Sequence, residues 1–161
     1  MTDISDAFAP HDHHACSGAA MDMAETLVRE RGLRMTPVRR RTLEILLESH
    51  RAMGAYDVLD RLAAEGFGRQ PPVAYRALEF LVEQGFAHRV QLLNAFAACL
   101  HPHTDHQPIF LICRGCNLVS EAPAEPLREA LTQTAAQSGF TVERQSIEAM
   151  GLCDTCQKAA A

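Results

Sequence analysis

Four of the six cysteines in this chain of 161 residues form two Cys-x-x-Cys pairs, and these pairs constrain the fold more than any other feature. Cys113 pairs with Cys116 and Cys153 pairs with Cys156, and 36 residues separate the two pairs. Four thiolates with this spacing are typical ligands of a tetrahedral zinc ion, and a site with four protein ligands keeps no open position for a substrate. The spacing therefore predicts a structural zinc site, and the function is expected to depend on other residues.

Two alternatives for these cysteines stay open, namely disulfide bonds and a redox-active dithiol whose oxidation releases zinc. The cellular compartment of the protein helps to decide between metal ligands and disulfides. The N-terminus has no apolar run after a basic start, and 18 consecutive apolar residues occur nowhere. We therefore expect a cytoplasmic protein without a membrane segment, where paired cysteines are more often metal ligands than disulfides.

The charge of the chain is unevenly distributed. The net charge is -5, yet residues 29–76 carry ten Arg against six acidic residues, while the flanking segments 1–28 and 77–161 are acidic. A basic segment between two acidic ones is a modest version of the surface that phosphate binding requires. The composition is thus compatible with a nucleic-acid partner.

Helical periodicity dominates the N-terminal half. Residues 1–20, which include His11, His13, His14 and Cys16, show no period and are predicted to be a disordered tail. A short helix is expected near 22–31. Further helices are expected to begin at Thr36–Pro37, where the hydroxyl caps and the proline takes the first position, and to cover about 55–65 and 71–84. Two short strands, 86–90 and 95–100, follow around a turn near Asn94.

These elements predict an α+β protein of two domains. Residues 21–100 fit a winged helix-turn-helix DNA-binding domain, whose fourth helix would enter the major groove. A polar hinge loop at 101–107 would separate it from a small α/β dimerisation domain at 108–161. In that domain we expect strands at 109–112, 118–121 and 140–149 and a helix at 124–138, held together by the four cysteines at its two ends.

Several separated motifs resemble the ferric uptake regulator family. They are Arg34-Met35-Thr36-Pro37-Val38-Arg39, Pro71-Pro72-Val73-Ala74-Tyr75-Arg76-Ala77-Leu78 and the two Cys-x-x-Cys pairs. Within this family, Ala55-Tyr56-Asp57, Leu81-Val82-Glu83-Gln84-Gly85-Phe86, the strand around Cys99 and Gly151-Leu152-Cys153 are similar to the zinc uptake regulator branch. The family usually has Thr-Val-Tyr-Arg where this chain has Val73-Ala74-Tyr75-Arg76, so one hydroxyl that could contact a phosphate is missing.

The resemblance implies a homodimer that binds palindromic operator DNA when loaded with zinc and represses zinc-import genes. It implies two zinc ions per subunit, a structural one held by the paired cysteines and a regulatory one held by His88, Cys99, His106 and Glu121. It also assigns DNA recognition to Tyr75 and Arg76, and we expect Arg39 and Arg69 to contribute to DNA binding. No small-molecule substrate is implied.

The regulatory set also makes chemical sense without the family. His88 and Cys99 lie on the two strands of the predicted hairpin, His106 lies in the hinge loop, and Glu121 lies in the second domain. Two imidazoles, a thiolate and a carboxylate suit zinc better than hard cations. Because the ligands come from both domains, one ion would fix how the domains are oriented. His101 and His103 are competing candidates that spacing alone does not exclude.

The sequence lacks the motifs of the enzymes that use comparable residues. A zinc-dependent base deaminase would need a His-x-Glu motif, and the chain has none; a glycine-rich phosphate loop and a His-Glu-x-x-His motif are also missing from the sequence. Catalysis is therefore not expected. A thiol redox sensor, or an iron, manganese or peroxide-responsive regulator of the same family, stays open, although Cys99 favours zinc.

Overall fold

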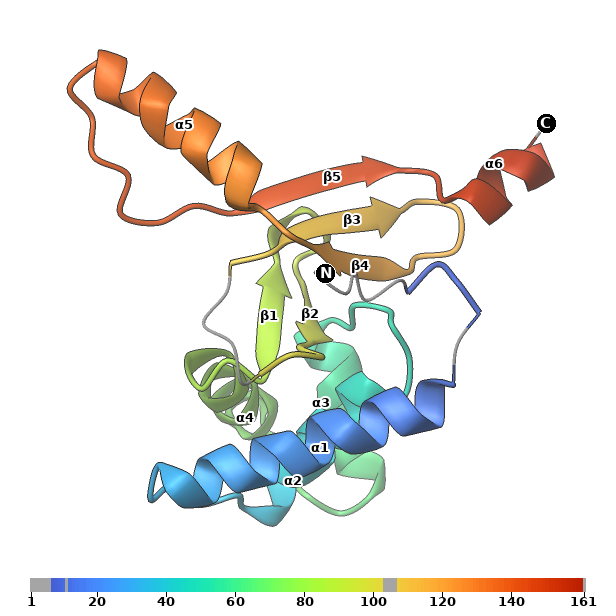
Figure 1. Ribbon diagram of the computed structural model, residues 1–161. Helices are drawn as coiled ribbons and strands as arrows, with labels where there is room; N and C mark the ends of the chain where they lie inside the picture. The colour runs from blue at the N-terminus through green and yellow to red at the C-terminus, as the bar shows by residue number, and fades with distance from the viewer. Residues whose placement is uncertain (1–6, 11, 103–106, 161) are drawn as a thin grey trace.

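The structure, a computed structural model, describes residues 7–10, 12–102 and 107–160. Four helices lie at one end of the molecule, a three-stranded sheet lies at the other, and a two-stranded antiparallel ribbon lies between them (Figure 1). Among the described residues, no helix combines the length and the hydropathy that crossing a membrane requires. The mixed helix and strand composition agrees with the α+β prediction.

The first helix begins earlier than predicted. α1 covers His13–Glu30, and the Asp12 side chain caps it by accepting a hydrogen bond from the Ala15 amide at 3.2 Å. The prediction of a disordered tail is therefore wrong for residues 13–20. The helix forms because Ala20, Ala24 and further apolar side chains of its inner face are buried against the other helices, a tertiary contribution that local periodicity understates.

The next three helices lie where the sequence predicts them. α2 covers Pro37–Leu47, and the Thr36 side chain accepts a hydrogen bond from the Arg39 amide while Pro37 occupies the first turn. α3 covers Ala55–Ala64 and α4 covers Pro71–Glu83. Their apolar faces form one core whose fully buried side chains include Leu43, Ile45, Leu46, Val58, Leu62, Leu78, Leu81 and Phe86.

A short antiparallel ribbon follows α4. β1 (Ala87–Val90) pairs with β2 (Ala95–Ala98), with His88 opposite Ala97. The connection contains the 3-10 turn η1 (Gln91–Leu93) and Asn94, which has a left-handed backbone with φ of 45°. Asn tolerates this conformation better than most residues, which agrees with the turn predicted there.

The C-terminal sheet has the order β4-β3-β5. β3 (Ile109–Cys113) is antiparallel to β4 (Val119–Ala122) and parallel to β5 (Ile147–Gly151). The parallel pair needs a crossover, which α5 (Glu125–Gln137) and residues 138–146 provide. The predicted strand 140–149 is too long, because regular pairing starts only at Ile147. A short helix that the sequence did not predict, α6 (Asp154–Ala160), follows.

The ribbon joins the two ends of the molecule. Val90 and Ala97 of the ribbon pack with Phe110, Ile112 and Val119 of the sheet in a small buried cluster. The Glu148 carboxylate accepts hydrogen bonds from the amides of Gln91 and Leu92 at 2.6 and 2.7 Å. The sheet therefore contacts the same ribbon that carries His88. The predicted hinge at 101–107 falls largely on residues 103–106, which lie outside the described residues.

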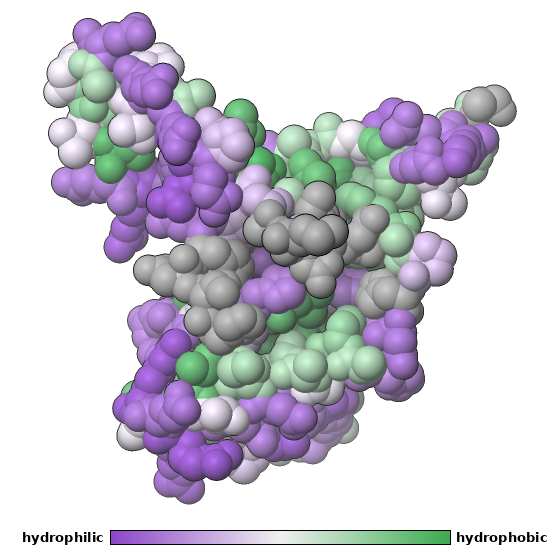
Figure 2. Space-filling view, in the orientation of Figure 1, coloured by the Kyte–Doolittle hydropathy of each residue, from purple (hydrophilic) through white to green (hydrophobic). Residues whose placement is uncertain are grey.

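α5 has few neighbours within the chain. None of its residues is buried, and the helix projects beyond the edge of the sheet (Figure 1). Leu127 is 49% exposed and Leu131 is 40% exposed, and apolar atoms are visible among hydrophilic ones over this helix (Figure 2). Phe140 and Met150, in the crossover and in β5, are also exposed. Large apolar side chains exposed on α5, in the crossover and on β5 are of the kind that contact surfaces contain.

Candidate metal centres and nucleic-acid interface

The four paired cysteines meet at one end of the sheet. Cys113 ends β3 and Cys116 follows in the next turn, while Cys153 follows β5 and Cys156 lies in α6. The parallel register brings the two pairs together, because Cys113 lies opposite Gly151. All four sulfur atoms lie within 4.8 Å of one another.

The sulfur separations fit a metal better than disulfides. The Sγ atoms of Cys116 and Cys153 are 3.9 Å apart, and no disulfide joins any two of the four paired cysteines. A disulfide would bring two sulfurs to about 2.05 Å, whereas tetrahedral zinc with bonds of about 2.3 Å separates them by about 3.8 Å. The geometry therefore matches a tetrahedral thiolate site.

The electrostatics of the cluster also favour a cation. The amide of Cys153 donates to the Sγ of Cys113 at 3.3 Å and, with other backbone amides, lowers the pKa of that thiol to about 6. Cys156 faces the other sulfurs, chiefly Cys153, and its pKa is raised to about 12. The protein alone thus stabilises the thiolate of Cys113, while a positive charge among the sulfurs would favour ionisation of Cys156.

Gly115 belongs to this centre, although the spacing of the cysteines did not single it out. A Cβ atom at Gly115 would lie 2.9 Å from the Sγ of Cys156 and 3.0 Å from its Cβ. The absence of a side chain here lets the loop between Cys113 and Cys116 approach α6. Only the tertiary contact between the two Cys-x-x-Cys segments reveals this requirement.

A second cluster lies between the ribbon and the sheet. It consists of His88 from β1, Cys99 just after β2 and Glu121 from β4, with donor atoms within 4.8 Å of one another. The Nε2 atom of His88 is 3.6 Å from a carboxylate oxygen of Glu121. Cys99 is only 1% exposed, and its amide donates to the carbonyl of Phe86 at 2.9 Å, which anchors it beside α4.

This cluster contains three of the four predicted regulatory ligands. The fourth, His106, and its competitor His103 lie outside the described residues. His101 is described but does not belong to the group formed by His88, Cys99 and Glu121. The three side chains come from two strands of the ribbon region and one of the sheet, so an ion bound to them would connect the two ends of the molecule.

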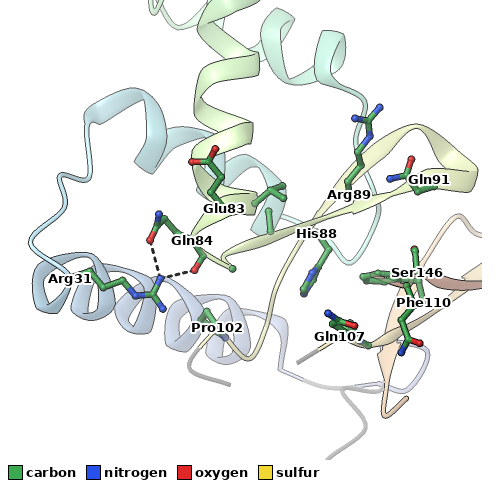
Figure 3. A pocket seen from close by; sticks show the side chains of 15 residues that line it. Arg31, Glu83, Gln84, His88, Arg89, Gln91, Pro102, Gln107, Phe110 and Ser146 are labelled. Carbon is green, nitrogen blue, oxygen red and sulfur yellow. Dashed lines mark hydrogen bonds between the residues drawn. The ribbon is translucent and has the colours of Figure 1, made fainter. Parts of the chain in front are cut away.

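A cavity of about 760 Å³ opens beside this cluster. His88 points from β1 towards Phe110, and Pro102 and Gln107 line the same cavity from both sides of the segment 103–106 (Figure 3). Arg31 closes another side, where its guanidinium donates to the carbonyl and side-chain oxygens of Gln84 (Figure 3). The cavity leaves space for further ligands to approach His88.

The outer face of α4 presents the residues predicted to contact DNA. Tyr75 is 40% exposed, Arg76 is exposed on the same helix, and Arg69 is exposed just before it. Tyr56 of α3, which no sequence motif marks as a DNA contact, is 64% exposed and lies edge to face with Tyr75 at 6.4 Å between ring centroids. The two tyrosine rings thus lie side by side, and Arg69 and Arg76 are exposed near the start of the same helix α4.

The arginines of α2 are mostly engaged within the chain. The guanidinium of Arg39 lies 3.7 Å from the centroid of Phe80 and donates to the carbonyl of Arg34 at 2.7 Å. Arg40 forms ion pairs with Glu25 and Glu44. Arg41 forms ion pairs with Glu44, Glu48 and Glu65. The basic footprint is therefore narrower than the excess of arginine in residues 29–76 indicates.

Comparisons with known proteins agree with this architecture. The zinc uptake regulation protein of Escherichia coli (strain K12) is 38% identical over 134 residues, which cover 83% of this chain and 78% of that protein. The structure of a zinc uptake regulator complexed with zinc and DNA superposes with a TM-score of 0.82 at 35% identity, covering 89% of this chain and 97% of the other.

Two crystal structures of one further protein, XcZur, differ in their likeness to this chain. Holo XcZur gives a TM-score of 0.76 at 37% identity over 88% of this chain and 97% of its own, whereas apo XcZur gives 0.52 at 35% identity over 89% and 99%. Because identity and coverage are similar, the difference in TM-score reflects a different backbone arrangement in holo and apo XcZur, and this chain is more similar to the holo form. Residues 30–150 match the sequence profile of the ferric uptake regulator family, and the chain therefore belongs to the ferric uptake regulator family.

Proposed function

We propose that this protein is a zinc-responsive transcriptional repressor that binds operator DNA as a homodimer and represses zinc-uptake genes in the cytoplasm. The observation that carries the proposal is the cluster of His88, Cys99 and Glu121, which joins the ribbon to the sheet. Its donor set of imidazole, thiolate and carboxylate suits zinc. The likeness to zinc uptake regulators, one of them complexed with zinc and DNA, supports the same function.

Two zinc sites per subunit are part of the proposal. The paired cysteines would hold a structural ion, and His88, Cys99 and Glu121 with His106 would hold the regulatory one. Zinc supplies a bridge between ligands that lie on different elements. β1 and the end of β2, which carry His88 and Cys99, are connected to α4, whereas Glu121 belongs to the sheet. The distance between these two groups of ligands would therefore set the orientation of α4 relative to the sheet.

The energy scale of this switch is adequate. A change of the competent population from 1:99 to 99:1 needs a differential affinity of about 5.5 kcal/mol. Structural zinc sites bind with roughly 10–16 kcal/mol, so a fraction of such an affinity suffices if only one arrangement gathers all the ligands. The buried position of Cys99 and the half-buried positions of His88 and Glu121 favour such a preference.

DNA recognition is assigned to the exposed face of α4. Tyr75 and Arg76 would read bases and Arg69 would contact phosphate, while Arg39 would act mainly by holding the start of α2 against α4. Dimerisation is assigned to α5, residues 138–146 and β5, where Leu127, Leu131 and Phe140 are exposed. A two-fold dimer would present two recognition helices to the two halves of a palindrome. No catalytic role is proposed.

The proposal is tested by retention of genomic DNA fragments on the purified protein across buffered concentrations of free zinc, with iron(II) and manganese(II) series in parallel. We expect retention to rise with zinc alone, while a tightly held zinc survives mild chelation. Stronger retention with iron or manganese would assign the sensor to another metal. Retention that no metal alters, but that low peroxide abolishes together with zinc release, would make the protein a thiol redox sensor.

A further inference from the structure

A third group of metal-ligating side chains lies at the start of α1. It consists of His13 and Cys16 in the first turn of that helix and His50 in the loop between α2 and α3. The sequence separates His50 from the other two by more than thirty residues, so only the fold brings them together. None of the three belongs to the two centres described above.

The donor atoms form a compact triangle. The Nδ1 of His13 is 3.1 Å from the Nε2 of His50, and the Sγ of Cys16 is 3.4 Å from the former and 3.9 Å from the latter. Tetrahedral zinc, with bonds of about 2.05 Å to nitrogen and 2.3 Å to sulfur, separates two nitrogens by about 3.3 Å and nitrogen from sulfur by about 3.6 Å. The observed triangle matches these separations to within a few tenths of an ångström.

We propose that His13, Cys16 and His50 form a third metal site that binds zinc and fastens the N-terminal turn of α1 to the loop after α2. Two imidazoles and one thiolate favour borderline ions such as zinc over magnesium or calcium. Three protein ligands leave one position of a tetrahedral ion for water. Binding replaces the thiol proton of Cys16 and uses the lone pairs of Nδ1 and Nε2, so one proton is released to solvent.

The surroundings of the three residues suit such a site. All three are half-buried, which keeps them accessible to an ion while limiting competition from water. Burial raises the pKa of the Cys16 thiol, so without a cation the group stays protonated at neutral pH. The Asp12 carboxylate, which caps α1 through the Ala15 amide, adds negative charge at the same helix end.

His50 connects the proposed third site to the C-terminal sheet. The carbonyl of His50 accepts a hydrogen bond from the amide of Val119 at 2.8 Å, and the neighbouring Arg51 bridges to Leu118. Glu121 lines the same small cavity as His13 and His50. Metal at the third site would therefore hold α1, the loop after α2 and the start of β4 in one arrangement, and would favour zinc binding at the cluster that contains Glu121, and reciprocally.

The three contacts could instead be hydrogen bonds of a metal-free cluster, and cobalt(II) distinguishes the two readings. The test uses full-length Cys99→Ser protein with zinc retained by the paired cysteines, so that Cys16 is the one thiol outside the paired cysteines. Titration with cobalt(II) is expected to give a sulfur-to-metal absorption band in the near ultraviolet, which an ion held by His88, Glu121 and His106 alone does not give. The band should vanish in Cys99→Ser/Cys16→Ser, whereas Cys99→Ser/His14→Gln, which changes an exposed neighbour, should keep it.

Zinc gives a second readout. At free zinc ten times its dissociation constant, opening of the first turn of α1 should be suppressed about tenfold, and amide exchange there should slow accordingly. This slowing should be lost in Cys16→Ser and kept in His14→Gln. An equal cobalt band with and without Cys16, or unchanged exchange at saturating zinc, would overturn the third site. Because neither readout uses DNA, failure of the proposed repressor function would be seen separately.

Discussion

Gly115→Ala tests how closely the two Cys-x-x-Cys segments must approach. The added methyl group would lie 2.9 Å from the Sγ of Cys156, whereas ordinary contacts of a Cβ begin at 3.4 Å, so one of the two must move by about 0.5 Å. Zinc ligands tolerate departures of about 0.2 Å from their normal bond lengths. If the loop and α6 cannot separate, one ligand is displaced by more than the site accepts. Changes around metal ligands typically reduce affinity about 10–100-fold, and we expect a loss in this range.

The assay is competition for zinc between the protein and a chromophoric chelator, with the oligomeric state followed by size-exclusion chromatography. The matched control is Gly151→Ala, because this glycine lies in β5 opposite Cys113 and a Cβ there meets no atom within 4 Å. Gly151→Ala should hold zinc as the original protein does. If Gly115→Ala also holds zinc with unchanged affinity, α6 can shift freely and the argument from close approach is wrong.

Three further substitutions separate the proposed roles. Cys99→Ser should keep the zinc of the paired cysteines and lose the zinc-dependent increase in DNA affinity; an unaltered zinc response, measured by fluorescence anisotropy of labelled operator, would remove Cys99 from the sensor. Arg76→Ala should weaken operator binding by about 1–3 kcal/mol with relaxed preference at one base pair, and equal losses on all sequences would mean that Arg76 contacts only phosphate. Arg41→Ala should leave DNA binding unchanged and lower the free energy of unfolding in urea by only about 0.2–1 kcal/mol; weaker operator binding would show that this arginine is not confined to its ion pairs.

Elements with strong local signals were predictable from the sequence. Thr36 and Pro37 specify the start of α2 by capping and by a fixed φ, and the four paired cysteines specify their cluster by spacing alone. The start of α1 was missed because its inner face consists mostly of alanine and methionine, whose periodicity is weak without the helices that cover them. Asp12 caps this helix, and one capping residue is a weak signal within the polar composition around it.

Contacts between distant segments account for most of what the sequence did not indicate. The stacking of Arg39 on Phe80 joins α2 to α4, which the sequence did not indicate, and the contact of Arg39 with DNA stays a prediction. The group of His13, Cys16 and His50 depends on the first turns of α1, where the sequence predicts a disordered tail. Three of the predicted regulatory ligands lie close together in the structure. The sequence could indicate this because it predicts the hairpin and β4 with nearly correct bounds, whereas the contribution of His106 stays a prediction.

The exposed side chains of α5 imply that the stability of this protein depends on its concentration. Within one subunit, this helix buries none of its residues, and the crossover that contains it supports the parallel pair of β3 and β5. If a second subunit supplies the missing contacts, separation of the subunits removes the packing that holds the crossover in place. Dilution would then loosen the strand that leads directly to Cys153, so the retention of structural zinc would depend on how many copies of the protein a cell contains.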